Sequence, residues 1–201
     1  VLNDNEGAAY FYHDLVQILG ESNVLFFPSA YRRAAKYGQK DDANAISADK
    51  AIVVDGQTGR VLYEKAADQK SLIASTTKIM TALVVCEQCN VLDRMRIPRE
   101  AVGIEGSSMY LKEGEVLTIQ ELLYGLMLCS GNDAAVALAE ICAGDTETFV
   151  GWMNQRAADL GMTGTHFSDP NGLGDENHYS TALDMAKLGR ACLNNERVAP
   201  I

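Results

Sequence analysis

The sequence predicts an α+β fold in which a helical cluster packs beside an antiparallel sheet. Two observations carry this prediction. Short β-branched runs flank a turn at 55–59, as in a β-hairpin, and apolar residues recur at helical spacing from Ser75 onward. Apolar residues make up 47% of the 201-residue chain, which is enough for a core. No apolar run reaches the roughly 20 residues that a membrane-spanning helix needs, so we expect no membrane span.

The first elements follow from local patterns. Strands are expected at 51–54 and 61–63, joined by the turn Asp-Gly-Gln-Thr-Gly. A helix that begins at Ser75 should be buried, because it is apolar on nearly every side. The next helix should begin at Thr118, since Thr118 and Glu121 have the spacing of a capping box, and should end near Ser130 and Gly131.

Three further helices are expected at about 133–141, 146–160 and 181–193. Gly144 and Gly161 follow two of them at positions where glycine commonly ends a helix. Between the last two helices, the run Asp-Pro-Asn-Gly-Leu-Gly at 169–174 predicts a loop.

Charge and cysteine usage exclude several functions. A formal charge of -10 and a pI near 4.7 argue against a nucleic-acid partner, which needs a basic face to neutralise phosphates. The five cysteines include a C-x-x-C pair, but no second Cys/His pair has the spacing of zinc ligands. We therefore expect the cysteines to be buried apolar residues rather than metal ligands or redox groups, and we expect no cofactor.

The tetrad Ser75-Thr76-Thr77-Lys78 is the first candidate for chemistry. At the start of a helix, Ser75 and Lys78 lie one turn apart on the same face. A lysine amine that burial keeps neutral can take the proton of the serine hydroxyl and so activate the serine as a nucleophile. A second S-x-x-K match at 47–50 lies before a strand, where no helix aligns the two side chains.

The tripeptide Ser130-Gly131-Asn132 is the second candidate, in the connection between two predicted helices. The Ser130 hydroxyl can relay a proton to a leaving amine, and the Asn132 amide can hold a peptide by donating and accepting hydrogen bonds. Taken alone, the tripeptide is more typical of a turn or helix cap than of a catalytic site. The order S-x-x-K then S-x-N, each at a helix boundary, favours a catalytic pair.

Four long stretches of the chain resemble the serine D-alanyl-D-alanine carboxypeptidases, which are low-molecular-mass penicillin-binding proteins with a β-lactamase/transpeptidase-like fold. They lie within about residues 46–195 and read STTKIMTAL, GSSMYLKEGEVLTIQELLYGLMLCSGNDAAVALAE, MNQRAADLGMTGTHFSDPNGL and YSTALDMAKLGR. By position, the resemblance implies that Ser75 is the acylated nucleophile, Lys78 its base, Ser130 the proton relay and Asn132 a substrate ligand.

The resemblance also implies partners and a compartment. The substrate would be a peptidoglycan stem peptide ending in D-Ala-D-Ala, β-lactams would acylate the enzyme, and the site of action would be extracytoplasmic. The first residues lack the charged segment, apolar segment and cleavage site of a signal peptide, so we expect that any signal peptide is already absent.

The family's third motif, K-T-G, does not occur in the sequence. This motif lies on a strand that lines the cleft and supplies one oxyanion-hole donor. We therefore expect the fold to be incomplete at its C-terminal end and the activity of this chain to be impaired. Two alternatives stay open: a catalytically silent remnant that only binds, and a serine β-lactamase.

The first part of the chain has a different character. Residues 1–46 are rich in aromatic residues and locally basic. Two segments of this part resemble a stretch of the UvrB-like module of transcription-repair coupling factors, and they read VLNDNEGAAYFYHDLVQILG and SNVLFFPSAYRRAAKYGQKDDAN. The prediction is an extension of different origin at 1–46, as in a fusion, followed by a partial carboxypeptidase domain at 47–201.

Overall fold

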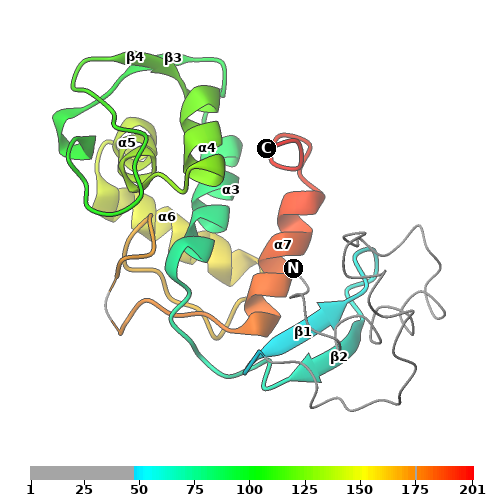
Figure 1. The fold of residues 1–201 in the computed structure, drawn as a ribbon. Helices are drawn as coiled ribbons and strands as arrows, with labels where there is room; N and C mark the ends of the chain where they lie inside the picture. The colour runs from blue at the N-terminus through cyan, green and yellow to red at the C-terminus, as the bar shows by residue number, and fades with distance from the viewer. Residues whose placement is uncertain (1–47, 175) are drawn as a thin grey trace, which may run out of the picture.

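The computed structural model describes residues 48–174 and 176–201 (Figure 1). Two small antiparallel sheets lie at opposite ends of the described part, and the helices lie between them. One sheet pairs β1 (Ala51–Val54) with β2 (Val61–Lys65), and the other pairs β3 (Arg94–Arg96) with β4 (Val116–Thr118). The α+β class is confirmed. The N-terminal extension lies outside the described residues.

The helices form one cluster around a central helix. Their bounds are η3 (Ala74–Thr77), α3 (Lys78–Gln88), η4 (Arg99–Ala101), α4 (Ile119–Leu128), α5 (Asn132–Ala143), α6 (Thr146–Asp159) and α7 (Ala182–Leu193). The central helix α3 contacts α4, α5, α6 and α7, which explains why it is apolar on nearly every side. This arrangement buries the end of α3 that follows Ser75.

The capping signals in the sequence are confirmed. The Thr118 hydroxyl accepts the peptide N–H of Glu121, and the Glu121 carboxylate accepts the peptide N–H of Thr118, so α4 begins with a complete capping box. Gly144 ends α5 with a φ of 87°, a left-handed conformation that favours glycine.

Two helix ends differ from the sequence prediction. The turn that carries Ser75 is the 3-10 helix η3, and α3 begins only at Lys78. A 3-10 turn has three residues, so it brings residues i and i+3 into line and places Ser75 and Lys78 directly one above the other. The helix expected to reach Ser130 ends at Leu128, because Ser130 has a φ of 54° and cannot continue a right-handed helix.

The prediction that the cysteines are buried apolar residues holds for only two of them. Cys86 and Cys192 are buried free thiols, whereas Cys129 is exposed. Cys89 and Cys142 form a disulfide that ties the end of α3 to the end of α5. Sequence spacing gave no sign of this pair, since 53 positions separate its members.

Among residues 48–174 and 176–201, every helix falls short of the length and apolarity that a bilayer crossing demands. In the same residues, no three His, Cys, Asp or Glu side chains gather where they could hold a metal ion.

Candidate functional site

The structure brings all four predicted site residues together around the Lys78 amine. Lys78 Nζ lies 3.0 Å from Ser75 Oγ, 3.3 Å from Ser130 Oγ and 2.8 Å from Asn132 Oδ1. Ser75 comes from η3, Ser130 comes from the α4–α5 connection, and Asn132 is the first residue of α5, more than 50 residues further along the chain than Ser75. One amine thus lies within hydrogen-bond distance of two hydroxyls.

Burial sets the protonation of Lys78. The side chain is only 2% exposed, and this loss of hydration disfavours the ammonium form and lowers the pKa of Lys78 below its usual value of 10.5. The negative charge of Asp169 opposes this effect but does not cancel it. A lysine with a lowered pKa is neutral in a larger fraction of molecules near neutral pH, and its lone pair can then accept the Ser75 proton.

Asn132 is held by backbone on its far side. Its side-chain amide donates to the carbonyl of Glu105 at 2.7 Å, and its peptide N–H donates to the carbonyl of Ser107 at 2.7 Å. With Oδ1 against Lys78, one N–H of the amide remains to donate to a peptide substrate. The loop at 105–111 therefore fixes Asn132 in the site.

Asp133 is a site residue that sequence reasoning missed. It is 1% exposed, and its carboxylate accepts hydrogen bonds from the peptide N–H groups of Met109 and Leu111 and from the Ser108 hydroxyl. Burial pushes its pKa upward, but these hydrogen bonds, with one from the Ala134 peptide N–H, outweigh burial and lower the pKa of Asp133 below 3.8. Its only sequence signal is its position next to Asn132.

The loop at 168–172 closes the other side of the site. The backbone carbonyl of Asn171 accepts from Lys78 Nζ at 2.9 Å, and that of Pro170 accepts from Thr81 Oγ1 at 2.6 Å. The Asp169 carboxylate accepts the peptide N–H groups of Asn171 and Gly172, which shapes the turn. The sequence predicted this loop but not its contact with Lys78, because a backbone acceptor has no residue signature.

Gly172 gives the first stability prediction. It has a φ of 90°, and a Cβ there would overlap the Ala74 carbonyl, which directly precedes Ser75. We expect Gly172→Ala to lower the free energy of unfolding by about 2–3 kcal/mol and to displace Ser75. The control is Gly151→Ala, since a Cβ at Gly151 meets nothing within 4 Å. Urea unfolding of both variants tests this, and equal stabilities would contradict it.

Comparison with known proteins identifies the family of the chain. The family described as D-alanyl-D-alanine carboxypeptidase matches residues 37–199. The D-alanyl-D-alanine carboxypeptidase DacF of Bacillus subtilis is 38% identical over 186 residues, which covers 90% of this chain and 47% of DacF. The D-alanyl-D-alanine carboxypeptidase of Streptomyces sp. K15 is 39% identical over 162 residues, 75% of this chain and 56% of that protein.

Solved structures agree in fold. The crystal structure of the D-alanyl-D-alanine carboxypeptidase DacD from Francisella tularensis superposes with a TM-score of 0.74 at 37% identity, over 80% of this chain and 42% of that one. Penicillin-binding protein 6B from Escherichia coli gives a TM-score of 0.70 at 35% identity, over 73% of this chain and 50% of that one. The fold is therefore the β-lactamase/transpeptidase-like fold of these enzymes.

The matches also bear on the first part of the chain. They give no support to its resemblance to the UvrB-like module. The match to DacF covers 90% of this chain, so it extends into residues 1–46. The division of the chain at residue 46 stays a prediction. The chain spans about half the length of the relatives it matches. Because the family match covers residues 37–199, which is most of the chain, the chain belongs to the D-alanyl-D-alanine carboxypeptidase family.

Proposed function

We propose that this protein is a serine D-Ala-D-Ala carboxypeptidase that removes the terminal D-Ala from peptidoglycan stem peptides through an acyl-enzyme. The observation that carries the proposal is the position of the buried Lys78 amine between the hydroxyls of Ser75 and Ser130. This arrangement supplies a nucleophile, a base and a route for the proton in one place.

The proposed reaction has two stages. Neutral Lys78 takes the Ser75 proton as Ser75 Oγ attacks the carbonyl of the scissile peptide bond. Lys78 passes this proton through Ser130 to the departing amine, so the peptide C–N bond breaks, free D-Ala leaves and an ester remains on Ser75. Water then hydrolyses the ester, which releases the shortened peptide as a carboxylic acid and restores the Ser75 hydroxyl. A β-lactam would enter the first stage in the same way but would leave a slowly hydrolysed ester.

Asn132 is proposed to orient the substrate. Glu105 takes one N–H of its amide and Lys78 contacts its oxygen, so the second N–H is available for the backbone carbonyl of the stem peptide.

The Cys89–Cys142 disulfide supports an extracytoplasmic location, because disulfides persist in oxidising compartments. The partners proposed are thus the stem peptide and, as covalent inhibitors, β-lactams.

The lowered pKa of Lys78 predicts the pH dependence of acylation. Only the neutral amine can accept the Ser75 proton, so the rate of acylation by a fluorescent penicillin should rise with pH and level off. Because burial lowers the pKa of Lys78, the midpoint should lie below 10.5. Rates measured from pH 5 to 10 test this. A rate that falls with rising pH would contradict the role of Lys78 as base.

The activity itself is tested with a peptide ending in D-Ala-D-Ala. We expect release of D-Ala, followed by mass spectrometry, that is lost in Ser75→Ala. The sequence contains no K-T-G, and the loss of one oxyanion donor costs about 10²–10³-fold, so we expect slow turnover by this chain. Release that survives in Ser75→Ala would contradict the proposal. Rapid repeated hydrolysis of penicillin without D-Ala release would indicate a β-lactamase instead.

A further inference from the structure

We propose that His178 is a positioning residue, which holds the 168–172 loop against η3 so that Lys78 stays buried beside Ser75. His178 contacts residues that neighbour the predicted site residues in the chain or in the loop. It acts through Thr77 on one side and through Ser168 on the other. The inference rests on the proposed role of Lys78 as the base.

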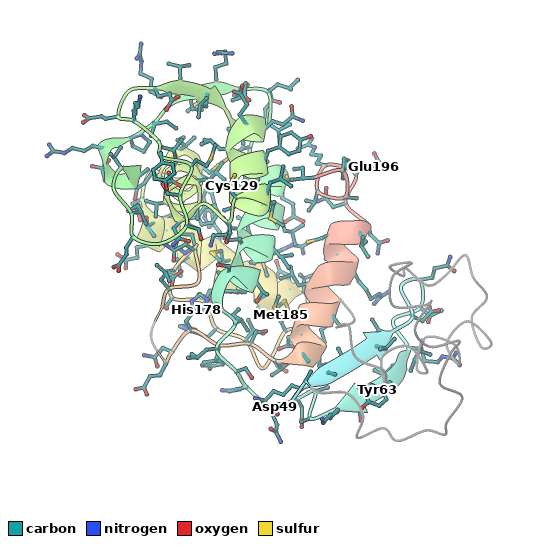
Figure 2. The ribbon with its side chains drawn as sticks, viewed as in Figure 1. Asp49, Tyr63, Cys129, His178, Met185 and Glu196 are labelled. Atoms are coloured by element: carbon teal, nitrogen blue, oxygen red, sulfur yellow. A yellow bond between two sulfur atoms is a disulfide. The ribbon has the colours of Figure 1, made fainter. Side chains whose placement is uncertain are left out.

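The contacts of His178 reach two separate segments of the chain. The imidazole is 2% exposed and lies beside the start of α3 (Figure 2). Its Nδ1 accepts the peptide N–H of Ser168 at 3.1 Å and lies 3.4 Å from the Asp169 carboxylate. Its Nε2 lies 2.6 Å from Thr77 Oγ1, within hydrogen-bond distance. His178 thus forms a bridge between Thr77 and the start of the 168–172 loop.

This bridge joins the two segments that surround the amine. Thr77 is fully buried and lies between Ser75 and Lys78 in the chain, although 101 positions separate it from His178. On the other side, Ser168 begins the loop whose Asn171 carbonyl accepts from Lys78. Loss of the bridge would leave the loop attached to α3 through the Thr81–Pro170 and Lys78–Asn171 hydrogen bonds.

A loosened loop has a predictable effect on Lys78. The loop covers the amine, and water would reach Lys78 if the loop moved away. Burial is the main reason for the lowered pKa of Lys78, so hydration would raise that pKa toward its usual value. Asp169 is the charged group that faces Lys78 from the loop, and its opposing influence is the smaller one. The titration of Lys78 therefore reports on the bridge.

The test uses two Thr77 variants of the full chain. Thr77→Val keeps the branched shape but removes the hydroxyl that hydrogen-bonds His178, while Thr77→Ser keeps the hydroxyl. We expect the Lys78 side-chain titration, followed by NMR, to move to higher pH in Thr77→Val and to return toward the wild-type position in Thr77→Ser. Penicillin acylation at pH 7 should slow about 10-fold or more in Thr77→Val, because a misplaced base costs rate.

A histidine pair provides the matched control. His178→Asn should shift the Lys78 titration in the same direction as Thr77→Val. His166→Asn should not, because His166 is an exposed residue that pairs with Tyr179 in an isolated β-bridge and whose ring contacts the Asn177 carbonyl. Thermal unfolding of all four variants shows that each is folded at the temperature of the titration.

The titration decides the inference separately from the proposed function. If Thr77→Val and His178→Asn leave the Lys78 titration where it is in the wild type, the positioning role is wrong, whatever happens to acylation. If wild-type protein is not acylated at Ser75 but the titration moves as expected, the proposed function fails and the positioning role stands.

Discussion

Replacing Lys78 with methionine is expected to slow penicillin acylation of Ser75 by about 10²–10⁴-fold, the usual contribution of a positioned general base. Methionine fills most of the buried space of the lysine side chain but has no amine to accept the Ser75 proton. The variant also leaves Ser130 without the group that hydrogen-bonds it at 3.3 Å. The measurement is the rate of fluorescent penicillin labelling under single-turnover conditions.

The control for Lys78→Met is Lys112→Met, at an exposed lysine of the loop before β4. We expect it to be labelled at the wild-type rate. Circular dichroism should show that both variants are folded. A folded Lys78→Met protein labelled within threefold of the wild-type rate would show that another group activates Ser75.

Replacing Asp133 with asparagine is expected to lower the free energy of unfolding by about 3 kcal/mol or more. The buried carboxylate accepts from four donors, two of them the peptide N–H groups of Met109 and Leu111. An amide turns an NH₂ group toward donors that need an acceptor, so some of these donors lose their hydrogen bonds. The same loop holds Asn132, and acylation should also slow.

Asp145→Asn is the matched control, because Asp145 is an exposed N-cap of α6 and asparagine caps helices equally well. We expect it to change stability by less than about 0.5 kcal/mol. Urea unfolding of the two variants gives the comparison. Equal stabilities of Asp133→Asn and Asp145→Asn would contradict the account of the buried carboxylate.

The lowered pKa of Asp133 adds a pH dependence to this stability. The folded protein binds the proton less readily than the unfolded chain does, so the stabilisation is fully present above the unfolded value, near 3.8. It is lost as the pH falls through the lower folded pKa. The stability difference between wild type and Asp133→Asn should therefore shrink in acid.

The sequence predicted the parts of the site that depend on side-chain type and local spacing. Ser75 and Lys78 face the same way because three positions make one helical turn, and Ser130 and Asn132 lie at a helix boundary that capping and glycine signals reveal. The resemblance to a known family then joined the two motifs. Their convergence on one amine is what the structure adds.

The parts that were missed depend on contacts between distant segments. The Asn171 carbonyl reaches Lys78 across 93 positions, and a backbone oxygen has the same identity in every residue. Asp133 resembles an ordinary first-turn acid until the 105–111 loop folds over it. The disulfide partner of Cys89 was likewise not evident, because cysteine spacing alone does not fix pairing.

Mass spectrometry of the penicillin adduct tests the central claim most directly. We predict one adduct, formed slowly, on the peptide that contains Ser75. It should disappear in Ser75→Ala and persist in Ser47→Ala, which alters the other S-x-x-K match in the sequence. An adduct that survives in Ser75→Ala, or no adduct on wild-type protein after prolonged incubation at millimolar penicillin, would contradict the assignment of Ser75 as the nucleophile.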